Sequence, residues 1–399
     1  MDKRKIILYT SDKYNGHAFE VFLEKLYEAF SDLNFEPVYI NIDKVVNIQN
    51  AIFLMQSNQV LFSIGINDTM LRIYGSDKPT YVYDYLDTVH VSLLQDAPYS
   101  VKIGDIYAPA RNHLICYLDR SHANMMKLLN LATDTSTKCF LPMAGDISNF
   151  GVKKEDYRED KIYDVVFCAG LWSGSPLRSW HNEADKVVSS ILDSIADYME
   201  IYPVSIYVAA KQVFTELNLD MEIMMPTLGQ YMWPLLEYIK TYRRIKAMSF
   251  LVDNNIRVDV FGSGWENVSY ANKLNLHGQV SYYESVQAIR KSKILFQDQA
   301  EFNDGAHDRV FTAMLNSTVV VSEYSKYLDE IFYRNKEIFF YDWKNGIQQV
   351  KIIGELLNDN DKRLKVAKNA YKKAVRNHQW INRAEIIVDF VYNKIKSVT

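Results

Sequence analysis

The sequence has few cysteines and lacks a long uncharged apolar run. Its three cysteines, Cys116, Cys139 and Cys168, are odd in number and widely spaced, which excludes a disulfide framework and a zinc-ligand spacing. We therefore expect core thiols in a reducing cytoplasm. The apolar run after the charged start MDKRK is only a few residues long, so we expect neither a signal peptide nor a transmembrane segment.

Neither sign of charge predominates. The formal net charge is −4 over 399 residues, and acidic and basic side chains are interspersed. This balance argues against a sequence-independent electrostatic grip on nucleic acid or on an anionic membrane, although a local basic pocket remains compatible with it. The histidines show no metal-ligand spacing, and the chain lacks a nucleophile-elbow motif.

Strand-like and helical segments alternate along the first half of the chain. Such alternation predicts crossover connections and a mostly parallel sheet. At 399 residues the chain is too long for one ordinary core, so we expect two α/β domains. The expected strands of the first half are 5–9, 37–41, 60–64, 80–84, 113–118 and 139–141, and the expected helices are 19–30, 45–55 and 121–131.

A second alternating series follows a polar, charged connector. We expect a Rossmann-like domain at 1–145, a linker at 146–161 and a second Rossmann-like domain at 162–376. A largely helical insertion at 179–254 serves either as a structural cap or as a substrate or partner surface. The final helical segment, 377–399, is expected to pack back on the first domain. The expected strands of the second series are 163–169, 257–262, 293–296, 318–322 and 337–341.

The stretch 296–323 combines a strand end, a polar loop, a short helix and a second strand. The loop 297–308 leaves the carboxyl end of a buried strand, where open parallel sheets bind their ligands. The helix that begins at Arg309 would present backbone N–H groups and a guanidinium to an anion. The stretch therefore predicts a phosphate site.

Two glycine-bearing loops follow other strands of the same expected sheet. They read GLWSGSPLR and FGSGW. The glycines Gly174, Gly262 and Gly264 would let a ligand approach the backbone closely, and Arg178 could neutralise a phosphate. An ordinary turn is the alternative for each loop. Because all these loops leave one edge of one sheet, their coincidence predicts a common binding edge.

Several segments in order resemble a known family. They are RVDVFGSGW, LHGQVSYYESVQAIRKSKILF, NDGAHDRVFTAML, FFYDW and NHQWINRA. Over 163–383 they resemble the C-terminal half of GT-B glycosyltransferases of the spore-maturation-protein-like group, with a group 1 type C-terminal domain. The first domain agrees only in architecture. The resemblance implies two Rossmann-like domains that face each other across a cleft.

The resemblance also implies a function. Such a bacterial-type enzyme would transfer a hexosyl group from a nucleotide diphosphate sugar, a UDP-sugar being favoured, to an acceptor hydroxyl. The acceptor would be a glycan, a protein or a small molecule. The family's G-x-H-x-R segment matches Gly305, His307 and Arg309, which would contact the donor diphosphate or sugar. With Arg178 and helix N-termini to balance the diphosphate charge, no metal is expected.

The resemblance is less complete at other donor positions. The base-binding segment would contain Tyr282 and Tyr283, for which packing is the alternative in a chain with 28 tyrosines. Many retaining members carry two glutamates where this chain has Asp304 and Thr312. Asp304 can bond a sugar hydroxyl, but Thr312 lacks the carboxylate that binds ribose. Together with Ser317 in place of the usual glycine, this departure leaves open an altered donor or a non-catalytic site.

The loop TSDKYNGHAF, after the first strand, would face the donor sugar from the first domain. His17 or Asp12 would serve as general base if the transfer inverts configuration, whereas a retaining transfer needs no base in that position. A solvated side chain is the alternative for His17. Asp84, Asp87 and His90 form a second candidate group at the end of another expected strand.

Other functions stay open at the level of sequence. A metal-dependent transferase would use an Asp-x-Asp after a strand, but Asp359 and Asp361 lie between helical segments, as turn and cap residues do. The alternatives are a nucleotide-sugar epimerase or hydrolase on the same scaffold, and a non-catalytic binding subunit of a glycosyltransferase complex. A homo-oligomer or a partner glycosyltransferase is compatible with the sequence.

Overall fold

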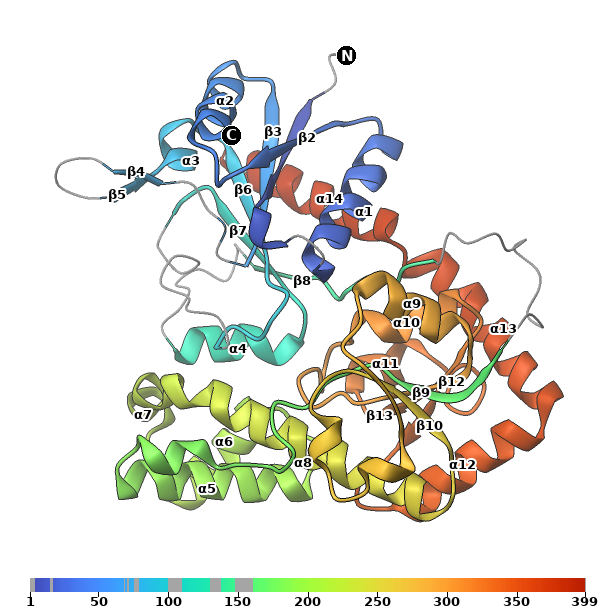
Figure 1. Ribbon diagram of the computed structural model, residues 1–399. Helices are drawn as coiled ribbons and strands as arrows, with labels where there is room; N and C mark the ends of the chain where they lie inside the picture. The colour runs from blue at the N-terminus through green and yellow to red at the C-terminus, as the bar shows by residue number, and fades with distance from the viewer. Residues whose placement is uncertain are drawn as a thin grey trace. The chain divides into compact units, whose positions relative to one another are not determined.

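The chain forms two compact units, one made of residues 1–142 and 380–399 and the other of 143–379 (Figure 1). Most of the predicted linker, residues 148–160, lies outside the described residues. The computed structural model describes residues 4–14, 17–67, 69, 72–74, 79–99, 110–129, 138–147 and 161–398.

The first unit is built on a parallel sheet whose six described strands have the order β2-β1-β3-β6-β7-β8. A separate two-stranded antiparallel ribbon, β4-β5, lies between β3 and β6 in the sequence. The strands are β1 Lys5–Thr10, β2 Glu36–Asn41, β3 Val60–Ile66, β4 Arg72–Tyr74, β5 Pro79–Tyr81, β6 Val89–Leu93, β7 His113–Tyr117 and β8 Lys138–Phe140. The helices are α1 Ala18–Asp32, α2 Val45–Gln56, α3 Val82–Tyr85, α4 Arg120–Leu128 and α14 Trp380–Val398.

Helices cover both faces of this sheet, which explains why β1 is apolar on both sides. Ile7 and Tyr9 pack with residues of α2 and α3. On the other face α1 and α14 lie side by side (Figure 1). The rings of Phe22 and Trp380 join them, with centroids 5.2 Å apart. The last helix of the chain therefore completes the core of the first unit.

The second unit has a parallel sheet whose six described strands have the order β11-β10-β9-β12-β13-β14. The order reverses between β9 and β12, the position at which doubly wound sheets bind ligands. The strands are β9 Tyr163–Phe167, β10 Val258–Phe261, β11 Asn275–Gly278, β12 Ser292–Gln297, β13 Val319–Glu323 and β14 Phe339–Tyr341. The helices that follow them are α9 Tyr282–Arg290, α10 Asp308–Leu315, α11 Lys326–Ile331, α12 Gly346–Asn358 and α13 Asn360–Asn377.

The core of the second unit follows from the alternation of side chains along its central strands. Val165 and Ile294 face α8 and α12. Val166 and Leu295, one residue further along each strand, point to the opposite face. There α9 and α10 pack against β9, β12 and β13. Both faces are thus covered by helices, as a parallel sheet requires.

The region between β9 and β10 is a bundle of helices. It contains α5 Lys186–Ile201, α6 Ile206–Glu216, α7 Met221–Leu228 and α8 Met232–Asp253. Helix α5 packs on both α6 and α8, and α8 also contacts α12. The long helix α8 therefore belongs to the bundle and to the core beneath the sheet.

A buried arginine ties α8 to the sheet. Arg243 donates to the carboxylate of Glu323 at 2.8 Å and to the carbonyls of Met199 and Tyr202 at 2.9 and 3.0 Å. Its guanidinium also lies 4.1 Å from the ring centroid of Trp343. Burial raises the pKa of Glu323, and the neighbouring Arg243 opposes that shift. Such a pair contributes most when both partners are present, because either one alone would be a buried charge.

The structure corrects two details of the predicted elements. The strand predicted at 80–84 ends at Tyr81, the last residue of β5, because α3 begins at Val82. The strands β6 and β11 were not predicted. The residues of β6, VHVSL, include two polar side chains that have partners inside the sheet: the Nδ1 of His90 bonds the hydroxyl of Ser63, and Ser92 bonds His113, each at 2.9 Å. The predicted break between helical segments at Asp359 is confirmed, because the side chain of Asp359 caps α13.

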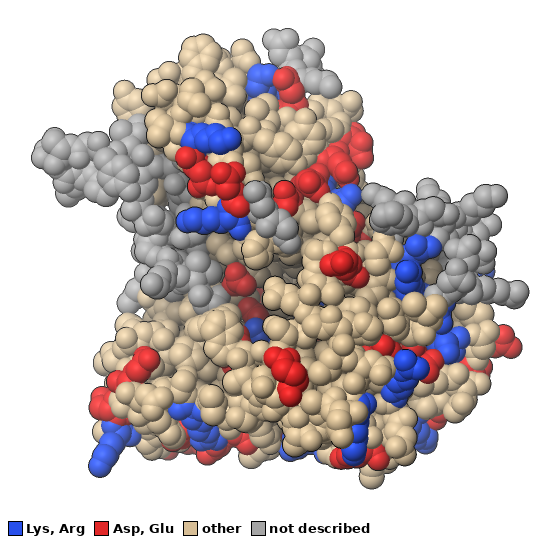
Figure 2. Space-filling model, in the orientation of Figure 1, with Lys and Arg blue, Asp and Glu red and all other residues tan. Residues whose placement is uncertain are grey.

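The surface and the thiols agree with the composition. Acidic and basic side chains are scattered over the face shown in Figure 2. Cys116 and Cys168 are buried, Cys139 is half-buried, and all three are free thiols. Of the helices that the structure describes, none has the length and apolar character needed to cross a membrane.

We predict that Arg243→Ala lowers the free energy of unfolding of the second unit by about 3 to 5 kcal/mol, because Glu323 is left as a buried charge. Urea unfolding followed by tryptophan fluorescence measures this change. Arg376→Ala, which removes an exposed arginine of α13, is the control and should alter stability by less than about 0.5 kcal/mol. Equal stabilities of the two variants would contradict the assignment.

Candidate functional site

The carboxyl edge of the second sheet gathers charged side chains from three elements. Asp298 directly follows β12, Asp308 and Arg309 begin α10, and Arg244 reaches this edge from α8. The side chains of Asp298 and Asp308 are buried, with exposed fractions of 6% and 3%. The sheet therefore brings two acidic and two basic groups together beside its switch point.

Arg244 and Asp298 form the centre of this cluster. The Nε of Arg244 donates to Asp298 at 3.0 Å, and one terminal nitrogen donates to the carbonyl of Gly170 at 2.7 Å. Burial disfavours the charged form of Asp298, but the guanidinium groups of Arg244 and Arg309 outweigh it and hold the pKa below the usual value. Asp298 is thus ionised at neutral pH, and Arg244 links it to the loop after β9.

Arg309 is the residue of the cluster with unused hydrogen-bonding capacity. Its Nε is buried and has no hydrogen-bond partner among the described residues. Burial lowers the pKa of the guanidinium, against the opposing charges of Asp298 and Asp308, yet an arginine stays charged in proteins. A buried donor without an acceptor is costly, so this position favours an anionic ligand.

His307 is the N-cap residue of α10. Its Nδ1 contacts a carboxylate oxygen of Asp308 and also accepts the backbone N–H of Arg309 at 3.4 Å. Burial and the charge of Arg309 lower the pKa of His307, although Asp308 opposes them. His307 is therefore neutral at pH 7, and its other ring nitrogen, Nε2, is the one that can form a hydrogen bond with a ligand.

The two candidate tyrosines differ in their surroundings. The hydroxyl of Tyr282 donates to Asp308 at 3.0 Å, and burial together with that carboxylate raises its pKa well above the usual value. Tyr282 thus positions Asp308. Tyr283 is 52% exposed, so it is the tyrosine with an accessible ring.

Thr312 does not face an open site. It is fully buried, and its hydroxyl accepts the N–H of Asp146 at 3.0 Å. Asn316, one turn later, donates to the carbonyl of Asp146 at 2.8 Å. A Cβ on Gly145 would lie 2.4 Å from the backbone of Phe311. Residues 143–147 lie directly on α10. Thr312 therefore contacts these residues in place of the donor contact that the sequence predicted.

The loop glycines pack against protein, which corrects the expectation that they leave room for a ligand. A Cβ on Gly262 would lie 2.4 Å from the backbone of Ala169, and one on Gly174 would lie 2.4 Å from Asn267. Gly264 has φ +86° and lies against Leu171, whose carbonyl would be 2.2 Å from an added Cβ. These glycines allow the loops after β9 and β10 to cross.

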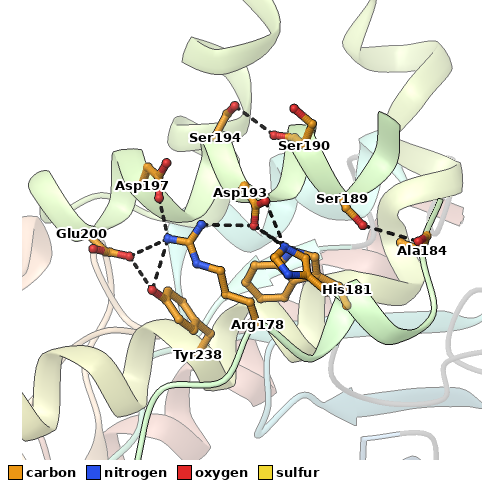
Figure 3. Close-up of polar contacts among 11 residues, drawn as sticks. Arg178, His181, Ala184, Ser189, Ser190, Asp193, Ser194, Asp197, Glu200 and Tyr238 are labelled. Carbon is orange, nitrogen blue, oxygen red and sulfur yellow. Dashed lines mark hydrogen bonds and ion pairs between the residues drawn. The ribbon is translucent and has the colours of Figure 1, made fainter. Parts of the chain in front are cut away.

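Arg178 also has different partners from those expected. Its guanidinium contacts the carboxylates of Asp193, Asp197 and Glu200 at 3.1, 2.5 and 2.9 Å. It also donates to the hydroxyl of Tyr238 at 3.3 Å. Figure 3 shows these groups converging on Arg178 from α5 and α8. The arginine is held within the helical bundle, where three carboxylates already balance its charge. Arg178 is therefore not assigned to the phosphate site.

Protein contacts hold the loop before α10 at Gly305 and Asp304, two of its residues that were predicted to contact the donor. The carbonyl of Gly305 accepts the hydroxyl of Ser325 at 2.6 Å. Asp304 is half-buried and lies 3.7 Å from the ammonium of Lys326. These contacts place the loop against the start of α11, and the assignment of Asp304 and Gly305 to the donor stays a prediction.

The candidate bases of the first unit lie beyond the carboxyl end of β1. Asp12 accepts from the amide of Asn41 at 2.6 Å, and its own N–H donates to Asp43 at 2.6 Å. His17 is the exposed N-cap residue of α1 and makes no side-chain capping bond. Both side chains are exposed, and their catalytic role stays a prediction.

The second candidate group of the first unit proves structural. Asp84 accepts the backbone N–H groups of Arg111 and Asn112 at 3.0 and 2.8 Å, and Asp87 accepts from the side chains of the same two residues. His90 is fully buried in β6. Their hydrogen-bonding groups fix a loop and a strand pair, so they do not form an acid–base group.

Two members of the cluster escaped the sequence predictions. Arg244 lies in the middle of α8, and only the packing of α8 beneath the sheet brings it to Gly170. Asp298 had a weak signal, since it follows a buried strand in the run FQDQ. Within the described residues, no group of three or more His, Cys, Asp or Glu side chains is arranged to hold a metal ion.

Comparisons with known proteins place this geometry in context. A family model described as glycosyl transferase-like matches residues 243–389, which contain Arg244, Asp298 and Arg309. The structure of Anabaena HepE in complex with UDP-glucose aligns over 98% of this chain and 99% of that one, with a TM-score of 0.51 and 9% identity. AviGT4, a glycosyltransferase of avilamycin A biosynthesis, aligns over 99% and 98%, with a TM-score of 0.52 and 11% identity.

The fold is that of the GT-B glycosyltransferases. The predicted fold class is thereby confirmed, and the family match together with the GT-B fold supports a glycosyltransferase. No curated protein sequence matches the chain. The spore-maturation-protein-like subgroup stays a prediction.

We predict that Thr312→Val destabilises the protein by about 1 to 3 kcal/mol, because the N–H of Asp146 loses its acceptor inside the protein. Chemical denaturation gives the change in stability, and UDP binding by the folded variant should equal that of the original protein. Thr215→Val, at an exposed threonine of α6, is the matched control. Lost UDP binding at unchanged stability would instead assign Thr312 to the ligand.

Proposed function

We propose that this protein is a GT-B glycosyltransferase that moves a hexosyl group from a UDP-sugar to an acceptor hydroxyl, without a bound metal, in the cytoplasm. The observation that carries the proposal is Arg309, a half-buried arginine at the start of α10 whose buried Nε is unsatisfied. The UDP-glucose held by HepE, which shares the fold, supports this choice of donor. The acceptor class, a glycan, a protein or a small molecule, follows from the transferase chemistry.

The chemical logic is stabilisation of the leaving diphosphate. As the sugar departs, negative charge grows on the diphosphate, and prearranged donors lower the barrier to that step. Arg309 and the amino end of α10 supply those donors from a rigid element. Arg244, bonded to Asp298 and to Gly170, adds positive charge and keeps the neighbouring loop in place.

The sugar would lie against the acceptors of the same edge. Asp304 offers a carboxylate oxygen as acceptor, and the Nε2 of neutral His307 on the same loop offers a further hydrogen-bonding atom. The accessible ring of Tyr283 is the aromatic candidate for the base. We further propose His17 or Asp12 as the base that deprotonates the acceptor if the reaction inverts.

We predict that Arg309→Ala abolishes sugar transfer and weakens UDP binding at least tenfold, because a charge-assisted hydrogen bond contributes about 1.5 to 3 kcal/mol. Isothermal titration with UDP and a turnover assay measure the two effects. The folded variant should keep its thermal stability within a few degrees. Arg257→Ala, at an exposed arginine before β10, should behave like the original protein. Unchanged kinetics in Arg309→Ala would refute the donor site.

The identity of the donor can be tested directly. A ligand that binds only the folded protein raises its melting temperature, so a thermal-shift screen of nucleotide sugars ranks the donors. The proposal expects UDP-sugars to give the largest shifts. Turnover of donor without any acceptor would instead indicate an epimerase or a hydrolase.

The burial of Thr312 favours one further candidate, a non-catalytic binding subunit of a glycosyltransferase complex. In that case the position that binds ribose in many retaining members has become part of the core. Absence of UDP-sugar binding, together with tight copurification with a second glycosyltransferase, would select this alternative.

A further inference from the structure

A second group of cations surrounds a cavity of about 260 Å³ in the second unit, which we call the basic cavity. Its polar lining consists of Lys161, Lys293, Ser317, Asn360 and Arg363, and Leu364 and Ala367 complete it. These residues come from the segment before β9, the start of β12, the turn before β13 and the start of α13. The basic cavity is therefore at the amino edge of the sheet, whereas Arg309 lies at the carboxyl edge. The six residues of β12 separate the two edges by roughly 20 Å.

Lys161 contributes charge to the basic cavity. Its ammonium donates to the carbonyls of Arg290 and Asn316 at 2.7 and 3.1 Å and to the hydroxyl of Thr318 at 2.9 Å. It thus caps the carboxyl ends of α9 and α10. Burial, followed by the positive charges of Arg290 and Arg363, lowers the pKa of Lys161 to about 7.

Lys293 and Arg363 contribute hydrogen-bond donors. Lys293 contacts the carboxylate of Asp164 at 2.6 Å, and Arg363 donates to the carbonyl of Leu356 at 2.9 Å and to the side chain of Asn360. An ammonium has three N–H donors and a guanidinium five, so these contacts use only part of their capacity. Asn360 is the first residue of α13, whose amino end adds the positive end of a helix dipole.

The charges around the basic cavity are unbalanced. Among the described residues that face Lys161 and Arg363, the cations Lys293 and Arg290 add to the positive charge, and the carboxylates of Asp164 and Asp359 oppose it. Burial is the largest cause of the lowered pKa of Lys161, and the positive charges of Arg290 and Arg363 add to it. An anion in the cavity would reverse that effect.

We propose that the basic cavity binds a small dianion, a phosphate or sulfate group, between Lys293, Arg363 and the first turn of α13, with Lys161 supplying further charge. The capping of α9 and α10 accounts for the position of Lys161. It does not account for Lys293 and Arg363, which come from two other elements and line the same space. This site is separate from the proposed donor site and does not depend on sugar transfer.

Binding should respond to pH through Lys161. A dianion favours the charged form of Lys161, so binding takes up a proton when the free protein has a neutral Lys161. The pKa of about 7 places this change near neutrality. Affinity should therefore rise as the pH falls through about 7 and become constant below it. Between about pH 8 and about pH 6 we expect a severalfold gain, with a limit of tenfold per pH unit.

The experiment is isothermal titration of the full chain with inorganic sulfate, which keeps two negative charges over this pH range. Lys293→Gln and Arg363→Gln should each weaken sulfate binding about tenfold. Lys368→Gln, at an exposed lysine of α13, is the matched control and should bind as the original protein does. Circular dichroism verifies that each variant is folded.

The Arg309→Ala variant separates the two anion sites. If the proposal holds, this variant still binds sulfate, and Lys293→Gln still binds UDP. The proposal is overturned if the original protein binds no sulfate, if Arg309→Ala alone removes the binding, or if affinity is the same at both ends of the pH range. The first and third of these outcomes do not bear on UDP binding at Arg309, whereas the second would assign the sulfate to that site.

Discussion

The organisation of the carboxyl edge depends on one buried carboxylate, that of Asp298, which lies near two guanidinium groups. Without them the charge would be too costly to bury, and without the carboxylate Arg244 and Arg309 would repel each other. The arrangement fixes the end of β12, the loop after β9 and the start of α10 together. A preorganised arrangement of this kind is what stabilisation of a departing anion requires, since the donors need not reorganise during the reaction.

Helix α10 runs from the carboxyl edge of the sheet, where Arg309 lies, to the amino edge, where Lys161 of the basic cavity contacts its end. Its amino end carries His307 and Arg309, and the carbonyl of Asn316 at its other end accepts a bond from Lys161. Along its side, Thr312 binds the backbone of residues 143–147. A helix of eight residues is thus held at both ends and in the middle, and it has little freedom to shift when a ligand binds.

The sequence allowed the fold to be predicted because its signals are local. The alternation of apolar strands and amphipathic helices, and the order of motifs from RVDVFGSGW to NHQWINRA, point to one architecture. The place of Arg309 at the start of a helix was also predictable, since a polar loop and a helix start follow a buried strand. The strands β6, VHVSL, and β11, NLHG, were missed because their patterns mix polar and apolar residues.

Some residues have partners that the sequence did not predict, because the partners of a side chain are set by packing. Arg178 follows a glycine-bearing loop, as a phosphate ligand would, but α5 supplies three carboxylates that no local pattern associates with it. The opposite holds for Arg244, which was not predicted as a site residue. It lies within an ordinary helix and becomes part of the candidate site only through the packing of α8. Thr312 sits where a ligand contact was expected, yet residues 143–147 occupy that side of α10.

The crossing of the loops after β9 and β10 has a consequence for protein engineering. Each of Gly174, Gly262 and Gly264 touches the backbone or a side chain of the opposite loop, so the two loops form one mutational unit. A library that randomises either loop as a whole would mostly yield misfolded members. Variation confined to the exposed positions between the glycines, such as Trp172, would leave the scaffold intact.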